Sequence, residues 1–284
     1  MSDSQQRPSV ILDKNVLQGL SLTKYLALAE RVRLVMPDVL FFECLKADSI
    51  ERARCFRALP PGDNPIALAH HLGHHLQHEI ETGEPLGRPS DHLIPWDYRF
   101  NSQLLDSKPL RPEVEEMVES ERLKHLARVP GYVERIQAMH RRLNDIVREQ
   151  GISRQAAAEA IRVGLLDLST VRNFLRDARD PEGAEFLPDA ETLGSNSAIV
   201  VHFQVTHALA LQRALDHGGE YEKEESVARL FPSLARELFD ADYLMLGVLE
   251  GGLATQEKRL RRIFEWLRPD GVLWPPPANP ATTD

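Results

Sequence analysis

The sequence contains few cysteines, and their number and spacing exclude several classes of protein. Only Cys44 and Cys55 occur among its 284 residues. Two cysteines cannot build the disulfide framework of a small secreted domain, and neither belongs to the paired spacing of a zinc site. Both lie in one predicted helical region, so we expect two buried thiols.

Long apolar runs and an excess of basic residues are also missing. No stretch is apolar over the length needed to cross a bilayer, and the polar amino terminus lacks the apolar segment of a secretory signal. We therefore expect a cytoplasmic protein with no membrane partner. The net charge of -9 argues against a whole surface that binds nucleic acid, but it is compatible with a local basic groove or a metal-filled acidic site.

The first informative stretch is a short apolar run that ends in a carboxylate. Residues 10–12 are too few and too unbroken for an amphipathic helix, and they predict a strand buried on both faces of a parallel sheet. Asp13 then falls at the carboxyl end of that strand, where open α/β sheets bind their ligands. A purely structural role for Asp13, as the cap of the next helix, is equally compatible with this segment.

A second strand is predicted at residues 32–36 and is followed by a helix that carries Glu43 among apolar neighbours. Burying this carboxylate is costly unless it is paired or bound to a metal, so Glu43 predicts a partner. A position at a solvated edge is the alternative.

From residue 60 onward the pattern becomes helical, and no strand is predicted before residue 231. A helix predicted at residues 65–82 places a group of histidines on its outward face: His70, His71, His74, His75 and His78. Their i to i+4 pairs could hold Zn²⁺ or Ni²⁺ in a sensing role, or the face could be solvated or contact a protein. Aromatic residues follow in a predicted loop, where they either anchor the loop or stack on bases: Trp96, Tyr98 and Phe100.

The carboxyl-terminal part returns to an α/β pattern. A helix predicted at residues 239–249 begins with Asp240, Asp242 and Tyr243. A very short strand then ends in Thr255 and Glu257, and it is followed by a helix and a last strand at residues 272–274. The chain is thus divided into a first α/β part at 1–59, an all-helical insertion at 60–196, a second α/β part at 197–274 and a tail without a fold at 275–284.

These acidic positions resemble the motifs of the PIN-like (PIN domain) nuclease family. The resemblance rests on Asp13 with Asn15, on Glu43 after the second strand, on Asp240-x-x-Tyr243-Leu244, and on residues 253–258 with a Thr two positions before an acidic residue. It implies a three-layer α/β fold with a short parallel sheet, interrupted here by the helical insertion. The sequence departs from the family in having Glu257 where Asp is usual. The third acidic position is Asp240 or Asp242, and the spacing to Tyr243 favours Asp240.

The resemblance implies a metal-dependent endoribonuclease that hydrolyses RNA phosphodiester bonds. Its ligands to Mg²⁺ or Mn²⁺ would be Asp13, Glu43, Asp240 or Asp242, and Glu257, while Asn15 and Thr255 would position water or a phosphate oxygen. The toxic component of a toxin–antitoxin pair is one role that the resemblance suggests. The helical insertion would then select RNA, bind a protein regulator or form a homo-oligomer.

An inactive PIN-like scaffold that recruits a partner through its insertion is the alternative, favoured by Glu257 and by the acidic net charge. Basic residues near Glu257 either contact RNA phosphates or form a solvated helix face: Lys258, Arg259, Arg261, Arg262 and Arg268.

Overall fold

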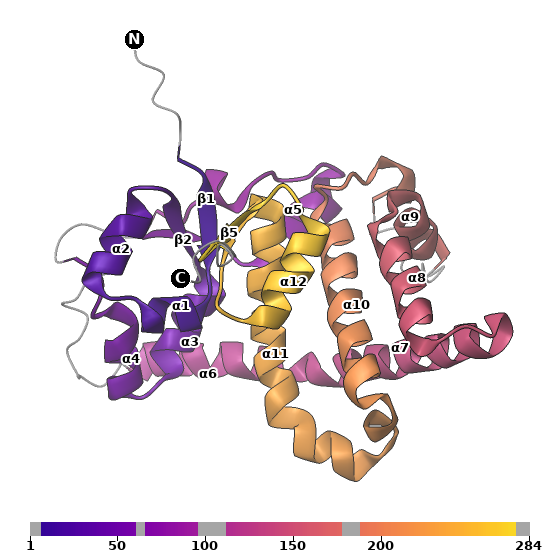
Figure 1. The fold of residues 1–284 in the computed structure, drawn as a ribbon. Coiled ribbons are helices and arrows are strands. Elements are labelled where there is room, and N and C mark those ends of the chain that lie inside the picture. The colour runs from indigo at the N-terminus through magenta and orange to yellow at the C-terminus, as the bar shows by residue number, and fades with distance from the viewer. Residues whose placement is uncertain (1–6, 61–65, 96–111, 178–187, 277–284) are drawn as a thin grey trace, which may run out of the picture. The chain divides into compact units, whose positions relative to one another are not determined.

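The computed structural model describes residues 7–60, 66–95, 112–177 and 188–276. These residues divide into two compact units, coloured along the chain in Figure 1. We call the described parts of Met1–His71, Arg88–Ser120 and Asp242–Asp284 the α/β unit. The helical unit comprises Leu72–Gly87 and the described parts of Glu121–Ala241.

The α/β unit is built on a five-stranded sheet in which every strand pair is parallel. Its strands are β1 (Ser9–Leu12), β2 (Arg33–Pro37), β3 (Ala67–Ala69), β4 (Gly252–Ala254) and β5 (Val272–Trp274). Their order is β3-β2-β1-β4-β5, so the buried strand β1 lies at the centre, as its unbroken apolar run predicts. The predicted α/β class with a short parallel sheet is confirmed.

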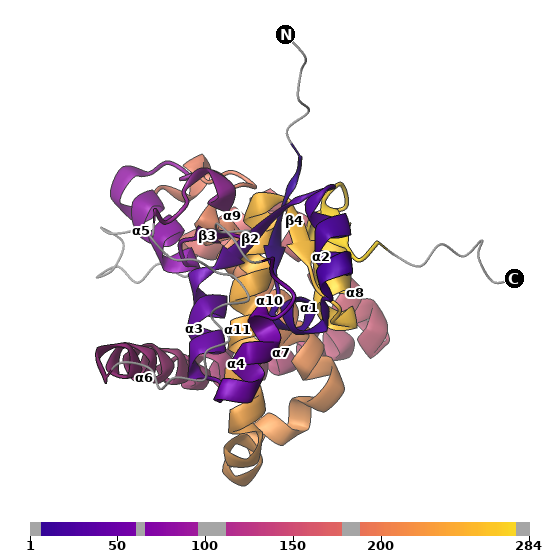
Figure 2. The ribbon, with the colours of Figure 1, turned by 90° about the vertical axis from the view of Figure 1, so that its left-hand side faces the viewer.

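Helices cover both faces of this sheet. They are α1 (Lys14–Gly19), α2 (Leu22–Ala29), α3 (Asp38–Lys46), α4 (Ser49–Phe56), α12 (Lys258–Leu267), the short 3-10 helix η1 (Pro89–Asp91) and the carboxyl-terminal end of α11 (Glu224–Glu250). Figures 1 and 2 show α1 to α4 on one face and α12 with the end of α11 on the other. The α/β unit is therefore layered as helix, sheet and helix.

Two glycines carry the chain from α11 into β4. Gly251 has a φ of 78°, a left-handed conformation that ends helices and favours glycine. Gly252 then begins β4 directly against β1, where a Cβ atom would collide with the carbonyl oxygen of Ser9. This close approach lets β4 pair with β1, so the carboxyl ends of the two strands lie side by side.

Two predictions about secondary structure after residue 60 are wrong. The chain forms β3 at Ala67–Ala69, although no strand was predicted there, because two alanines and one leucine carry little strand propensity. The next helix, α5, spans Leu72–Thr82 rather than 65–82. Its histidine face is not wholly outward, since His75 is 1% exposed, whereas the apolar Ile80 of the same helix is 40% exposed.

The helical unit has no strand among its described residues. It contains α5, α7 (Val129–Gln150), α8 (Arg154–Leu166), α9 (Leu168–Asp177), α10 (Ala198–His217), the 3-10 helices η4 (Ala190–Thr192) and η5 (Gly218–Glu222), and parts of α6 (Pro112–Ala127) and α11. The predicted insertion at 60–196 thus differs from this compact unit, which includes α10 and most of α11.

Buried side chains in the two units confirm one prediction and explain one contact between helices. Cys44 and Cys55 are buried free thiols, as predicted. In the helical unit, the Glu79 carboxylate of α5 accepts a hydrogen bond of 3.1 Å from the Ile199 amide in the first turn of α10. No helix in the described ranges combines the length and apolar character needed to cross a membrane.

Candidate acidic site of the α/β unit

The candidate site lies where the strand order of the sheet reverses. β1 pairs with β2 on one side and with β4 on the other, and the order changes direction between β1 and β4. Asp13 follows the last residue of β1, and Thr255 follows the last residue of β4. Parallel α/β sheets bind ligands in the crevice beyond such neighbouring carboxyl ends.

Asp13 caps the helix that follows it and also contacts the end of β4. It is the N-cap of α1, and its Oδ1 accepts a hydrogen bond of 3.3 Å from the Asn15 amide. Its Oδ2 accepts a hydrogen bond of 2.5 Å from the Thr255 hydroxyl, and its own amide donates to the Ala254 carbonyl at 3.0 Å. The side chain is 3% exposed, so these contacts fix a buried carboxyl group between the two strand ends.

The surroundings of Asp13 favour its protonated form. Burial raises the pKa of Asp13 to about 6, the hydrogen bonds from Thr255 and Asn15 oppose this shift, and the carboxylates of Glu257 and Glu43 add to it. Three acidic residues that the sequence predicted to converge, from β1, α3 and the end of β4, therefore interact electrostatically. Carboxylates held this close repel one another unless a proton or a cation separates them.

Glu43 lies on α3 and has partners on two other elements. Its Oε1 is 3.1 Å from the Lys14 ammonium, and its Oε2 accepts a hydrogen bond from the Tyr243 hydroxyl of α11. Burial would lower the pKa of Lys14, but the Glu43 carboxylate raises it above its ordinary value. Burial and Glu43 also hold the pKa of Tyr243 well above its ordinary value. Glu43 was expected to need a partner, and it has two within the chain: the Lys14 ammonium and the Tyr243 hydroxyl.

Hydrogen bonds link Asn15, Thr255 and their neighbours beside Asp13. The Asn15 Oδ1 accepts a hydrogen bond of 3.2 Å from the Gln256 amide. The Thr255 Oγ1, which donates to Asp13, accepts one of 3.1 Å from the Glu257 amide. Asn15 and Thr255 therefore brace the ends of β1 and β4 against each other.

Asp240 and Asp242 lie in α11, which differs from the predicted helix. The sequence placed Asp240 at the start of a helix at 239–249, whereas α11 begins at Glu224 and places Asp240 in its interior. The helix continues through Pro232, a residue that usually interrupts helices. Asp242 is 8% exposed and Asp240 is half-buried. Asp240 lies about one turn before Tyr243, and its choice over Asp242 as a metal ligand stays a prediction.

Two of the i to i+4 histidine pairs are not contained in one helix. His70 and His71 precede α5, which begins at Leu72, so neither can pair with His74 or His75 across a helical turn. The rings of His74 and His75 instead meet edge to face at 6.2 Å. Throughout the described ranges, no group of three or more His, Cys, Asp or Glu side chains has the arrangement of a ready-formed metal site.

The basic residues after Glu257 have different surroundings. Arg261 donates to the Thr255 carbonyl at 3.1 Å, and Arg268 donates to the Val248 carbonyl at 2.8 Å. Arg259 lies 4.0 Å from the Glu257 carboxylate. Lys258 and Arg262 are exposed. The aromatic residues interpreted as loop anchors or base-stacking groups, Trp96, Tyr98 and Phe100, lie outside the described residues.

Sequence reasoning missed one residue of this site, Lys14. It lies directly after Asp13 and holds Glu43, which the sequence had shown to need a partner. A lysine next to the strand-end carboxylate was the available signal.

Comparison of the chain with protein-family models, curated proteins and solved structures finds no match. The resemblance to PIN-like nucleases therefore stays a prediction from the residues. The arrangement of Asp13, Glu43 and Glu257 in the α/β unit is the basis for any functional proposal.

Proposed function

We propose that this protein is a metal-dependent, PIN-like endoribonuclease that hydrolyses RNA phosphodiester bonds at the acidic site. The observation that carries the proposal is the buried carboxyl group of Asp13, which lies at the strand-order reversal and interacts with the carboxylates of Glu43 and Glu257. A buried acid with a perturbed pKa in such a crevice is typical of functional sites.

The donor set fits a hard divalent cation. Asp13, Glu43 and Glu257 supply carboxylate oxygens, with Asp242 as a further ligand from the part of α11 that belongs to the α/β unit, and Mg²⁺ and Mn²⁺ prefer such oxygens. A bound dication would offset the repulsion that contributes to the raised pKa of Asp13. When bound, the metal would lower the pKa of a coordinated water and neutralise charge on the leaving oxygen.

Residues of the chain orient the carboxylates for this role. Thr255 and the Asn15 amide hold Asp13 in one orientation at the end of β1. Tyr243 holds one oxygen of Glu43. Lys258 and Arg262 are exposed on α12, in the first residues after Glu257, where they can contact phosphates of the RNA backbone.

One observation favours the alternative of an inactive binding or scaffold protein. Both oxygens of Glu43 already have partners, the Lys14 ammonium and the Tyr243 hydroxyl. An internal cation that satisfies the carboxylate removes part of the need for a metal. In this version the helical unit would bind a protein regulator or a second copy of the chain.

The deciding experiment measures cleavage of a mixed RNA pool by the purified full chain with Mn²⁺, Mg²⁺ or EDTA. We expect metal-dependent cleavage that falls to the EDTA level in Asp13→Asn. Asp48→Asn is the matched control, because Asp48 is also a helix N-cap in the α/β unit, with hydrogen bonds to the Ile50 and Glu51 amides, but it is exposed. Asn is as good a cap as Asp, so both variants should fold.

Cleavage that persists in Asp13→Asn would reject the acidic site as the active site. Absence of both cleavage and Mn²⁺ binding, measured by calorimetry on the folded protein, would favour the scaffold instead.

A further inference from the structure

The helical unit contains a cavity of about 410 Å³ that the proposed nuclease activity does not use. It lies among α7, α8, α9 and α10, and its walls are mainly apolar, with Met139, Ile146, Ile161, Leu165 and Val171 among them. Its volume lies within the range of about 300–1,000 Å³ that is typical of small-molecule sites. A cavity of this size and lining can enclose a chain or ring of drug-like dimensions.

Arginine side chains supply the only full charges among the described lining residues. Arg135 and Arg142 both line the cavity, and no Asp or Glu does. Arg135 is half-buried, and within the described ranges its guanidinium has no hydrogen bond or ion pair. Burying a cation without a counterion is costly, so the cavity wall has an unmet requirement for an anion.

Aromatic rings form the part of the wall contributed by α9 and α10. The rings of Phe203 and His207 are tilted by 30° with centroids 3.9 Å apart, and the Phe174 ring lies 5.9 Å from that of Phe203. Burial, partly opposed by a hydrogen bond to the Phe203 carbonyl, lowers the pKa of His207 to about 4. His207 is therefore neutral at pH 7 and leaves Arg135 as the anion-binding group of the inner wall.

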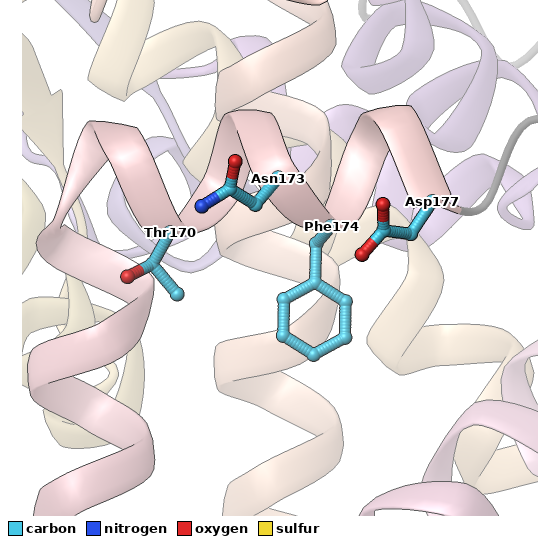
Figure 3. Close-up of a pocket in the computed structure, with 4 residues that line it drawn as sticks. All are labelled: Thr170, Asn173, Phe174 and Asp177. Atoms are coloured by element: carbon cyan, nitrogen blue, oxygen red, sulfur yellow. The ribbon is translucent and has the colours of Figure 1, made fainter.

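Phe174 and Thr170 also border a second hollow, which Asn173 and Asp177 of α9 line with them. Figure 3 shows Thr170, Asn173, Phe174 and Asp177 along one face of that helix, with the Phe174 ring projecting between them. The ring is 54% exposed although it is large and apolar. The Asp177 carboxylate lies only in the second hollow, so an anion is favoured on the Arg135 side alone.

We infer that the cavity binds an amphipathic carboxylate, with its apolar chain or ring among α7 to α10 and its carboxylate on the Arg135 guanidinium. Arginine is well suited to this task, because its planar donors match both oxygens of a carboxylate. The apolar walls would bind the body of the ligand, and Arg135 would select against neutral analogues of the same shape.

The test measures decanoate binding to the full chain, with displacement of the fluorescent probe anilinonaphthalene sulfonate as the signal, and 1-decanol as the neutral counterpart. We expect saturable displacement by decanoate that Arg135→Gln weakens about tenfold to a hundredfold, with little change for 1-decanol. Arg148→Gln is the matched control, since Arg148 is an exposed arginine of α7 that pairs with Asp145 outside the cavity.

A second variant blocks the cavity without relying on charge. Ala160 lines the cavity but is exposed, so Ala160→Trp can fill the entrance without disturbing a buried position, and it should abolish binding of both ligands. Circular dichroism verifies that each variant is folded. Equal decanoate affinity in the natural chain and Arg135→Gln, or equal weakening of decanoate and 1-decanol, would overturn the inference. Self-association that Ala160→Trp disrupts, without decanoate binding, would instead assign this surface to a second copy of the chain.

Discussion

Asp13 in the α/β unit and Arg135 in the helical unit are ionisable groups of opposite charge in apolar surroundings. In the α/β unit, Asp13 lies buried beside the carboxylates of Glu43 and Glu257. In the helical unit, Arg135 lies half-buried on an apolar cavity with no acidic residue among its described lining. Neither Asp13 nor Arg135 has an ion pair with a described residue. Each position is therefore suited to a ligand of the opposite charge, a dication at Asp13 and a carboxylate at Arg135.

The units also differ in what positions those charges. In the α/β unit the backbone does so, because Asp13 and Thr255 are fixed by the ends of two paired strands. In the helical unit the cavity depends on how four helices pack through their side chains. The same kind of substitution should therefore have different consequences in the two units.

The largest expected effect comes from replacing one glycine in each unit. Gly252→Ala should destabilise the α/β unit by about 3 kcal/mol, because the added Cβ collides with the Ser9 carbonyl and separates β4 from β1. Gly131→Ala should stabilise the helical unit by about 0.5–1 kcal/mol, because it lies in α7 with no atom near its Cβ position. Unfolding in urea measures the free energy of unfolding of both variants. Changes of the same sign in the two variants would contradict the expected difference between the units.

Asp13 and His207 should respond to pH in opposite directions, because burial raises the pKa of a carboxyl group and lowers that of an imidazole. The pKa of Asp13 is raised to about 6 in the folded protein, so its contribution to stability is complete below pH 4 and is lost as the pH rises through 6. The pKa of His207 is lowered to about 4, so its contribution is complete above pH 6.5 and is lost as the pH falls through 4. Each effect is at most about 3 kcal/mol.

The measurement is the free energy of unfolding in urea between pH 4 and pH 7.5, in EDTA, for the natural chain, Asp13→Asn and His207→Gln. The difference between the natural chain and Asp13→Asn should fall with rising pH, whereas the difference from His207→Gln should rise. Parallel curves for all three proteins would show that neither group is linked to folding.

The sequence was most informative where function depends on the ends of strands. Asp13, Thr255 and Glu257 follow short apolar runs, and the carboxyl ends of parallel strands meet at one edge of a sheet. Glu43 was recognisable because a carboxylate among apolar helix residues requires a partner. The parallel α/β class could therefore be predicted from local pattern alone.

Features that depend on tertiary packing were not predictable. Strand β3 is three residues of low strand propensity, and it forms because it pairs with β2. His75 is buried by its neighbours in the helical unit although its own helix pattern indicated exposure. Arg135 and His207 are 72 residues apart along the chain, and no local pattern indicates that they line one cavity.

The smallest of the expected effects separates the nuclease from the scaffold most directly. The Lys14 ammonium lies 3.1 Å from Glu43 and should compete with a dication for that carboxylate. We expect Lys14→Met to tighten Mn²⁺ binding about tenfold, or about 1.4 kcal/mol, as measured by calorimetry at pH 7.5.

Lys24→Met is the matched control for this competition, because Lys24 is an exposed lysine of α2 whose side chain has no hydrogen bond or ion pair with the described residues. Mn²⁺ affinity that is unchanged or weaker in Lys14→Met would show that Glu43 is not a metal ligand. Tighter Mn²⁺ binding combined with slower RNA cleavage would instead show that Lys14 is needed after the metal is bound. The two readouts together therefore distinguish a lysine that only substitutes for a metal from one that serves the nuclease itself.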